Sequence, residues 1–354
     1  SGLAVLRAVA TMSPAVEPGI AVVGAGNWGT TLAVLQARAG RRVLLCARNE
    51  ERAAQLDADR ENRAWLAGIP FPEDLLLGSG YAAACAAPLI VIAVPSEHLR
   101  AACTALRPSL GRQSRLVSAT KGLELGSGLR MSQVIAEVLP TAGAGLGVLS
   151  GPNLAGEIAA GLPAAAVLAG VDPTVTATSA EELSTRLFRL YTSDDVVGVE
   201  LGGALKNVVA LAAGICDGLE MGLNGKAAIV TRGMAEIVRL GTACGAQAAT
   251  FAGLSGYGDL FATCVSPLSR NHSVGERLGR GASLAEIRAD MTMVAEGVST
   301  ARAALSLASR LGVELPITEQ VCEVLFADRD PRTAMDILLA RSARDEGTGA
   351  ILGA

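Results

Sequence analysis

Residues 20–29 read IAVVGAGNWG, a short apolar run followed by three glycines in the spacing G-x-G-x-x-G. Such a glycine turn between a strand and a helix is typical of loops that bind the diphosphate of a dinucleotide. Because the chain has 41 glycines among 354 residues, the triplet alone is weak and the flanking sequence must support it. A helix is expected at residues 28–39, and a second apolar run follows at 42–46. This context favours a dinucleotide loop over a glycine turn without a ligand.

Each glycine of this turn has a different structural role in the predicted loop. Gly24 permits the tight turn, Gly26 lets the main chain approach a diphosphate, and Gly29 allows the helix to pack on the sheet. The helix that follows presents unpaired N–H groups and the positive end of its dipole to the phosphates. The turn therefore predicts a site for a dinucleotide cofactor.

Apolar runs alternate with helical segments through the first 199 residues. Six runs are expected to be strands: residues 20–23, 42–46, 89–94, 115–119, 146–149 and 165–168. Strands that alternate with helices predict an α/β fold with a doubly wound, Rossmann-like parallel sheet. From residue 200 onward the sequence is rich in Ala, Leu and Gly at helical spacing. We therefore predict a Rossmann-like domain at 19–199 and an all-helical domain at 200–354, packed closely together.

The composition makes some classes of partner poor candidates. Half of the residues are hydrophobic and 18% are charged, as in globular proteins, and the net charge is -4. Because no long basic run is present, neither nucleic acid nor an anionic membrane is an expected partner. Residues 77–96 carry no charge, but two glycines and two prolines interrupt them. We predict a buried strand there rather than a membrane span.

Cysteine and histidine usage bears on compartment and metals. The seven cysteines form no C-x-x-C pair and only two histidines are present, so no structural zinc or other metal site is predicted. Reduced thiols in the cytoplasm are the expected state. Residues 1–18 are expected to form a disordered tail. If that tail is a processed transit remnant, an organelle stroma replaces the cytoplasm as the expected location.

The end of the second predicted strand bears on the choice between NAD and NADP. An NAD site usually places an acid about 20 residues after the first glycine. Here residues 41–51 read RRVLLCARNEE, and Arg48 is the first polar residue beyond the strand. Arg48 can pair with the 2′-phosphate of NADP or stack on adenine, and a solvated surface arginine is the alternative. We predict that NADPH is accepted, and the use of NAD stays open.

Two lysines are candidates for chemistry. Lys206 is the only charged residue from Leu201 to Cys216, and burial in a helix would lower the pKa of its ammonium toward the range useful for proton transfer. Lys121 ends a predicted strand, at the sheet edge where doubly wound folds bind ligands. Lys206 could instead extend to the surface, and Lys121 could be a solvated charge. If the two share a site, each lowers the pKa of the other and together they attract an anion.

A third segment, LSGYGDLFATCVSPLSRN at residues 254–271, combines an acid with a potential anion clamp. Asp259 follows a glycine-rich stretch, and Arg270 and Asn271 follow a proline and two serines at an expected turn or helix start. A guanidinium beside an amide and hydroxyls can bind phosphate oxygens in a fork. Alone, Ser-Arg-Asn is more typical of a helix cap.

Seven segments carry a resemblance to a known family. In chain order they read GAGNWGT, AVPSEHLR, SATKGLE, SGPNLAGEIAAGLPAA, LKNVVALAAGICDGLEMGLNGKAA, LSGYGDLFATCVSPLSRNHSVG and MVAEGVSTARA. Together they closely resemble the soluble NAD(P)-dependent glycerol-3-phosphate dehydrogenases of bacterial and plastid type, from about Gly19 to Ala304. Several long matches in a fixed order are more specific than any single motif.

The resemblance implies a reaction and an assembly. The reaction is reversible hydride transfer between sn-glycerol 3-phosphate and dihydroxyacetone phosphate with NAD or NADP, feeding phospholipid synthesis, and the assembly is a homodimer. Lys206 is implied as the general acid and base, and Lys121 as the residue that holds the substrate and polarises its carbonyl. Asp259 is implied as the group that positions or balances Lys206.

The resemblance also implies two sets of binding residues and no metal. The substrate set is Lys121, Gly151, Asn153, Lys206, Asp259, Thr263, Ser269, Arg270 and Asn271. The cofactor set is Gly24, Gly26, Asn27, Trp28, Gly29, Arg48, Pro95, Lys121, Ala155, Arg270, Val294 and Glu296. At position 153 many members are expected to carry Ser, and the Asn found here can still donate a hydrogen bond.

Two other interpretations of the same residues stay open at this point. A 6-phosphogluconate or 3-hydroxyacid dehydrogenase would share the Rossmann and helical domains and would also use a lysine. A non-catalytic dinucleotide sensor would bind cofactor alone, but it would not need Lys206, Lys121 and Asp259 together. The segment around Arg270 and Asn271 and the Thr-Lys-Gly strand end favour a small phosphorylated ketone as substrate.

Overall fold

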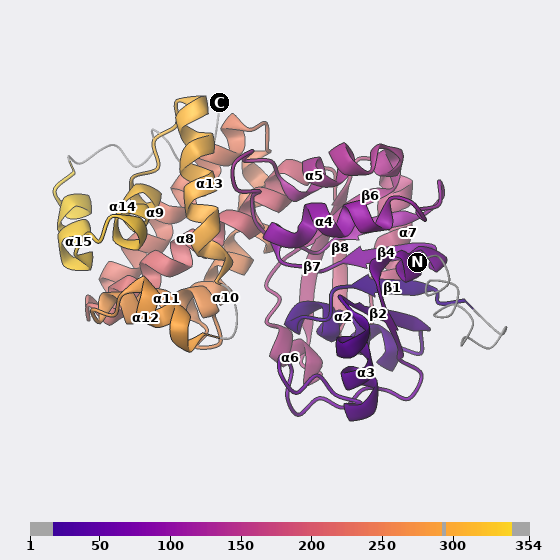
Figure 1. Ribbon diagram of the computed structural model, residues 1–354. Helices are drawn as coiled ribbons and strands as arrows, with labels where there is room; N and C mark the ends of the chain where they lie inside the picture. The colour runs from indigo at the N-terminus through magenta and orange to yellow at the C-terminus, as the bar shows by residue number, and fades with distance from the viewer. Residues whose placement is uncertain (1–16, 292–294, 342–354) are drawn as a thin grey trace.

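The computed structural model describes residues 17–291 and 295–341. The tail predicted at 1–18 lies outside these residues except for its last two positions, and Val294 of the predicted cofactor set lies outside them as well. In Figure 1 the indigo-to-magenta sheet and its helices form one part of the molecule, and the orange and yellow helices form the other.

Eight strands form one sheet in the order β3-β2-β1-β4-β5-β6-β7-β8. The strands are β1 (Ile20–Val23), β2 (Val43–Ala47), β3 (Leu76–Ser79), β4 (Leu89–Ile92), β5 (Arg115–Ser118), β6 (Leu146–Ser150), β7 (Ala164–Gly170) and β8 (Phe188–Ser193). Strand β1 pairs in parallel with both β2 and β4, so the strand order reverses beside β1. A ligand of a doubly wound sheet binds outside the carboxyl ends of the strands at such a reversal.

The sheet confirms the predicted fold class and differs in three details. All six predicted strands are present, but β3 and β8 were not predicted. Strands β6 and β7 are antiparallel, whereas the prediction was a purely parallel sheet. The connection between them, residues 151–163, contains only the five-residue helix α6 (Ala155–Ala159) and no long crossover helix of the kind that usually joins parallel strands. The chain re-enters the sheet in the opposite direction.

Helices cover both faces of the sheet. On one face α2 (Asn27–Arg38), α3 (Glu50–Asp59), α6 and α7 (Pro173–Leu183) pack on alternate strand residues such as Val22. On the other face the 3₁₀ helix η1 (Tyr81–Ala86), α4 (Ser96–Leu106) and α5 (Met131–Val138) pack on the residues between, such as Val23. A second 3₁₀ helix, η2 (Pro140–Gly145), precedes β6. The central strands are thus apolar at consecutive positions, as buried parallel strands are.

The described residues from Val196 onward form helices and no strand, as predicted. The helices are α8 (Val196–Gly218), α9 (Gly222–Ala243), the 3₁₀ helix η3 (Ala248–Ala252), the π-helical turn η4 (Leu254–Gly258), α10 (Asp259–Val265), α11 (Arg270–Gly279), α12 (Leu284–Asp290), α13 (Glu296–Leu311), α14 (Pro316–Phe326) and α15 (Pro331–Leu339). Strand β8 ends at Ser193 and α8 begins three residues before the predicted division at Val199.

Helix α8 is the centre of the helical part. Its residues 198–216 are all buried, and α9, α11, α13 and α14 contribute to the apolar cores around it. It is long and apolar enough to cross a membrane, yet 89% of its most apolar window is buried inside the protein. A Cβ on Gly214 would lie 2.1 Å from the carbonyl oxygen of His272 in α11, so the two helices meet at backbone distance. Residues 77–96, the other apolar stretch, are divided among β3, η1, β4 and the start of α4.

Contacts at two places after β5 help to tie the sheet to the helical part. Leu123, in the loop after β5, is 2% exposed and packs in the apolar core formed by α8, α9 and α13. Glu200 of α8 accepts hydrogen bonds from the backbone N–H of Ser132 at 2.7 Å and from its hydroxyl at 2.6 Å, and it pairs with Arg130. This buried carboxylate therefore caps the N-terminus of α5 across the junction.

Candidate active site

The glycine turn after β1 is packed tightly on two sides and open on the third. Gly24 has φ +109°, and a Cβ there would lie 2.6 Å from the carbonyl oxygen of Ala93. A Cβ on Gly29 would lie 1.9 Å from the carbonyl oxygen of Gly24. A Cβ on Gly26 would meet no atom within 4 Å. Gly24 and Gly29 are thus required by packing, whereas Gly26 leaves room for a ligand against the main chain.

The first turn of α2 is suited to an anion. Gly26 is the N-cap residue and supplies no side chain to pair with the free N–H groups, and the first turn contains no acid. The Oδ1 atom of Asn27 is buried without a hydrogen-bond partner among the described residues. Open space and unpaired donors at one helix N-terminus fit the diphosphate of a dinucleotide, whereas Oδ1 of Asn27, an acceptor, would need a donor other than the diphosphate.

The other predicted cofactor residues lie around this turn or near it. Trp28 is half-buried and packs edge-on against Phe188, with ring centroids 6.2 Å apart. Arg48 is exposed at the carboxyl end of β2, and Pro95 is exposed at the start of α4. The carbonyl of Ala155 accepts a hydrogen bond from Thr31 of α2 at 3.2 Å. The structure thus gathers these residues from separate strands and helices beside the sheet edge.

Asp259 is the centre of a buried charged group that joins the two parts of the molecule. It is 1% exposed, and its Oδ2 accepts a hydrogen bond from Nζ of Lys121 at 2.5 Å. Its Oδ1 pairs with Nζ of Lys206, which also donates to Oγ1 of Thr263 at 2.6 Å. We call Asp259, Lys121, Lys206 and Thr263 the Asp259 cluster. The sequence separates these residues by up to 142 positions, and the fold brings them within hydrogen-bond distance.

The fold of each segment explains this meeting. Lys121 follows β5, and its Nζ also donates to the carbonyl of Gly151, which follows β6, at 3.0 Å. Gly151 has φ +150°, and a Cβ there would lie 2.8 Å from Cα of Ala166, so only glycine fits. The carboxyl ends of two neighbouring strands therefore deliver a cation and a bare carbonyl to the same point.

Helix α8 and the turn η4 deliver the other half of the cluster. Gly202 lies one helical turn before Lys206, and a Cβ on it would lie 2.5 Å from the carbonyl of Ser255 in η4. This contact seats the π-helical turn directly on α8, so that Asp259 at the start of α10 faces Lys206. π-helical turns are rare and frequently occur at functional sites.

Burial sets the protonation of Lys206. The pKa of Lys206 is lowered to about 8, chiefly because removal from water disfavours the ammonium; the charge of Asp259 opposes this shift, and that of Lys121 contributes to it. Lys206 is therefore still protonated at neutral pH but can lose its proton within a mild pH range. An amine poised in this way can act as a general acid and as a general base.

Glu296 is a further acid whose protonation the cluster influences. It is the first residue of α13. Burial raises the pKa of its carboxyl above the usual value, although the positive charges of Arg270, Lys121 and Lys206 oppose this shift.

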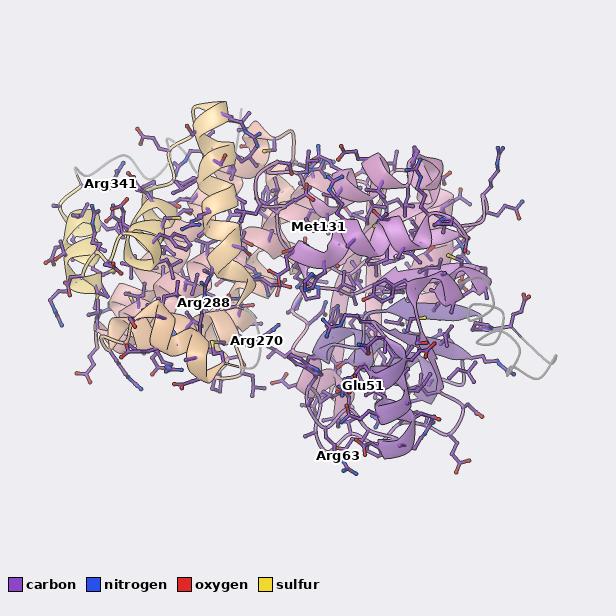
Figure 2. The ribbon with its side chains drawn as sticks, viewed as in Figure 1. Glu51, Arg63, Met131, Arg270, Arg288 and Arg341 are labelled. Carbon is purple, nitrogen blue, oxygen red and sulfur yellow. The ribbon has the colours of Figure 1, made fainter. Side chains whose placement is uncertain are left out.

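The predicted phosphate clamp is divided between exposed and buried residues. Arg270 is exposed at the start of α11, and Figure 2 shows it on the side of the helical part that faces the sheet. Ser269 is the N-cap of α11, and its hydroxyl accepts from the backbone N–H of His272 at 3.3 Å. Asn271 donates to Oδ1 of Asn207 at 2.9 Å, and its own Oδ1 accepts from Gly297 N–H at 2.9 Å. Ser269 and Asn271 thus hold α11 in place, and Arg270 extends from it.

Several buried polar atoms near the sheet edge have no partner among the described residues. They are both amide atoms of Asn153 and the hydroxyl oxygens of Ser118, Ser150 and Thr300. Asn153 lies two residues after Gly151, whose carbonyl binds Lys121. A buried amide without partners is costly unless a ligand or water satisfies it, so Asn153 fits the predicted contact with a substrate.

Some residues of this site escaped the sequence analysis. Asn207 follows Lys206 and is not among the predicted residues, although two adjacent polar residues in an apolar helix are a usable signal. Thr300 and Glu200 gave no signal, because single polar residues in helical segments are common. In the described parts of the chain no cluster of three His, Cys, Asp or Glu side chains could hold a metal ion, and all seven cysteines are free.

Two family models match the chain. The N-terminal model of NAD-dependent glycerol-3-phosphate dehydrogenase matches residues 19–176, and the C-terminal model matches residues 195–336, beyond the limit of the resemblance at Ala304. Glycerol-3-phosphate dehydrogenase [NAD(P)+] of Geobacter metallireducens is 48% identical over 92% of this chain and 98% of its own length. The Corynebacterium glutamicum enzyme of the same name is 47% identical over 92% of this chain and 99% of its own.

Solved structures agree with the family models. The crystal structure of glycerol-3-phosphate dehydrogenase from Coxiella burnetii covers 92% of this chain and 99% of its own, with a TM-score of 0.87 and 36% identity. The glycerol-3-phosphate dehydrogenase structure from Saccharomyces cerevisiae covers 91% and 99%, with a TM-score of 0.77 and 26% identity. With the glycine turn, the Asp259 cluster and these matches over nine-tenths of its length, the chain belongs to the NAD(P)-dependent glycerol-3-phosphate dehydrogenase family.

Proposed function

We propose that this protein catalyses the reversible, NAD(P)H-dependent reduction of dihydroxyacetone phosphate to sn-glycerol 3-phosphate. The observation that carries the proposal is the Asp259 cluster, in which one buried carboxylate binds the ammonium groups of Lys121 and Lys206. Two cations against one anion leave a net positive charge, which favours an anionic substrate and a developing alkoxide. Family membership names the substrate pair, and the geometry supports the chemistry.

Lys206 is the general acid of the proposed reduction. As hydride reaches C2 of the ketone, charge develops on the C2 oxygen, and the ammonium of Lys206 supplies the proton there. In the reverse direction the neutral amine removes the hydroxyl proton. The pKa of about 8 supports both tasks near neutral pH, because the group is mostly protonated yet exchanges its proton readily.

Lys121 and Asp259 prepare the site for that transfer. Lys121 holds the substrate and polarises its carbonyl, supported by its place between the carbonyl of Gly151 and the carboxylate of Asp259. Asp259 orients Lys206. Its negative charge also offsets the repulsion between the ammonium groups of Lys121 and Lys206. Thr263 accepts a hydrogen bond from Lys206 and fixes the direction of its Nζ.

The substrate phosphate binds at the start of α11. Arg270 supplies the charge that pairs with it, because guanidinium binds phosphate oxygens in a fork. Ser269 and Asn271 set the position of α11, and Asn271 keeps one amide hydrogen for the ligand. Gly151 and Asn153 complete the substrate set, with the unsatisfied amide of Asn153 as the supporting observation.

The cofactor binds at the glycine turn formed by Gly24, Gly26 and Gly29. When bound, NADH or NADPH supplies the hydride. Asn27, Trp28, Pro95, Ala155 and Glu296 surround it, with Val294 as a further contact. Arg48 stands where an acid is typical of strict NAD sites, so we propose that NADPH is accepted as well as NADH.

Family membership extends the proposal to the whole protein. We propose a division into a cofactor domain at 19–199 and a catalytic domain at 200–354, and a homodimer as the assembly. The product would feed glycerophospholipid synthesis in the cytoplasm, or in an organelle stroma if residues 1–18 are a transit remnant. The proposal includes no nucleic-acid partner and no membrane insertion.

Oxidation of NADH and NADPH by the purified protein tests the proposal. Dihydroxyacetone phosphate is added, and the loss of nicotinamide absorbance is followed in parallel samples. Rapid oxidation is expected with both cofactors, and negligible NADPH activity beside strong NADH activity would contradict the assignment of Arg48. If dihydroxyacetone phosphate causes no oxidation of the cofactor but the protein acts on 6-phosphogluconate or a 3-hydroxyacid, that compound is the substrate. Cofactor binding without any turnover would favour a sensor.

A further inference from the structure

Asn62 is a fully buried polar residue that the proposed mechanism does not use. It lies in the loop after α3, in the sequence Arg60-Glu-Asn-Arg63, and is 0% exposed. Asparagine in a loop of charged residues is normally solvated, because burying an amide costs free energy unless all its groups are paired. The burial of Asn62 therefore calls for specific partners.

Those partners belong to the glycine turn. Nδ2 of Asn62 donates to the carbonyl oxygen of Ala25 at 3.1 Å and to Oγ1 of Thr30 at 2.7 Å. Oδ1 accepts from the guanidinium of Arg52 in α3. Both amide hydrogens are thus committed to the segment between Gly24 and the first turn of α2, and the amide oxygen is committed to α3.

The bond to Ala25 fixes the direction of a neighbouring N–H group. The peptide that joins Ala25 to Gly26 is planar and trans, because no cis peptide occurs in the described residues, so its C=O and N–H point in opposite directions. Since Asn62 holds the C=O, the N–H of Gly26 points away from Asn62. A Cβ on Gly26 meets no atom within 4 Å, so the main chain there is open to a ligand.

We propose that Asn62 is a positioning residue for the cofactor diphosphate: it orients the Ala25–Gly26 peptide and the first turn of α2 so that their N–H groups are arranged before the cofactor binds. The inference rests on the proposed function, because it assumes that the glycine turn binds a dinucleotide. Preorganised donors bind an anion more tightly than donors that must be ordered on binding. Arg52, four residues after Arg48, donates to Asn62 and so connects Asn62 to the segment that follows β2.

Gln36 provides a matched control within the same helix. It is 1% exposed, its Nε2 donates to the carbonyl of Leu183 at 2.7 Å, and its Oε1 accepts from Arg41 at 2.5 Å. Gln36 thus resembles Asn62 in burial and in its pairing with a backbone carbonyl and an arginine. It lies in the last turn of α2, away from the glycine turn.

The test compares Asn62→Ala with Gln36→Ala by calorimetric titration of two ligands. ADP-ribose contains the diphosphate, and adenosine, measured as a competitor of NADH, contains no phosphate. Asn62→Ala is expected to weaken ADP-ribose binding by about tenfold, the equivalent of ~1.4 kcal/mol, and adenosine binding by less than about twofold. The KM for NADH is expected to rise by a similar factor, with kcat at saturating NADH and the KM for dihydroxyacetone phosphate nearly unchanged. Gln36→Ala should lower thermal stability without these changes.

Three results separate this inference from the proposed function. If the wild-type protein does not bind ADP-ribose, the cofactor site itself is wrong. If wild type and Asn62→Ala bind ADP-ribose equally, or if Gln36→Ala weakens it as much, Asn62 has no positioning role. Should Asn62→Ala fail to fold, Thr30→Val takes its place: it removes one of the two bonds to the turn. A loss of about threefold in ADP-ribose affinity is then expected, the square root of the tenfold effect, and unchanged affinity overturns the inference.

Discussion

The glycine turn at residues 24–29 offers its main chain, whereas the Asp259 cluster consists of buried charged side chains. In the turn, two glycines are required because backbone atoms leave no room for a Cβ, and the third leaves open space. In the cluster, two lysines and an aspartate are paired inside the protein, with Asp259 1% exposed. A main-chain site is sensitive to added atoms, and a side-chain site is sensitive to removed charges. Substitutions should therefore separate binding from chemistry.

The largest effect is expected when the cluster loses its proton donor. Lys206→Met should lower kcat by a factor of about 10² to 10⁴ or more, because a general acid contributes on that scale, and it should leave NADH binding intact. Lys226→Met is the matched control, since Lys226 also pairs with an aspartate, Asp217, at 2.6 Å but lies outside the Asp259 cluster. Stopped-flow turnover and NADH titration measure the two effects. Near-normal turnover in Lys206→Met would remove Lys206 from the mechanism.

Loss of the proposed phosphate contact should weaken substrate binding and leave cofactor binding nearly unchanged. Arg270→Ala removes charge-assisted hydrogen bonds worth about 1.5–3 kcal/mol, so the KM for dihydroxyacetone phosphate should rise roughly 10- to 100-fold. The KM for NADH should change far less. Steady-state kinetics with each substrate varied in turn provide the comparison, with Arg288→Ala, an exposed arginine of α12, as control. Equal increases in both KM values would argue against a phosphate clamp.

Atoms added to the glycine turn should weaken cofactor binding at Gly26 and destabilise the fold at Gly29. A side chain at Gly26 enters open space, so Gly26→Val should keep the fold and raise the dissociation constant of NADH by about tenfold or more through steric conflict with the diphosphate. Gly29→Val places a Cβ 1.9 Å from the carbonyl of Gly24 and should destabilise the fold itself. Thermal denaturation and NADH titration distinguish them. Equal melting temperatures for the two variants would contradict the packing assigned to Gly29.

The smallest effect near neutral pH is the titration of Lys206. Because its pKa is lowered to about 8, ketone reduction, which needs the ammonium, should be constant below pH 8 and fall about tenfold per unit above it. Alcohol oxidation needs the neutral amine, so its rate should rise toward pH 8 and then level off. Profiles of kcat in both directions test the sign. A reduction rate that increases through pH 8 would contradict the role of Lys206 as acid.

The two regions also differ in how well sequence predicts them. The sequence predicts the glycine turn with its strand and helix, because the close packing of the turn requires glycines at fixed positions among consecutive residues. Lys121, Lys206 and Asp259 were singled out, but their shared hydrogen bonds were not derivable, since they depend on the tertiary meeting of α8, α10 and β5. Ser269 and Asn271 show a related limit: both were expected at the substrate, and the structure adds contacts that hold α11 in place.

The sheet shows where local patterns were insufficient. Strand β3 is four residues long and half-buried, so it lacks the continuous apolar character of β4. Strand β8 alternates between buried Phe188 and Leu190 and exposed Arg189 and Tyr191, a pattern that could have been recognised. The reversal between β6 and β7 accompanies a connection with only a short helix, and composition does not reveal the direction of a strand. Asn62 gives no local signal because its partners, the Thr30 hydroxyl and the Ala25 carbonyl, lie 32 and 37 positions away.

The burial of α8 has a consequence for how the chain is synthesised. This apolar helix emerges from the ribosome before α9, α11, α13 and α14, which later cover it. At about 5–20 residues per second, the roughly 100 residues between Gly218 and the end of α14 need about 5–20 s. During that interval a segment with the hydropathy of a membrane span is uncovered on the nascent chain. Chains that stop early should therefore aggregate or recruit chaperones, even though the finished protein buries most of the helix.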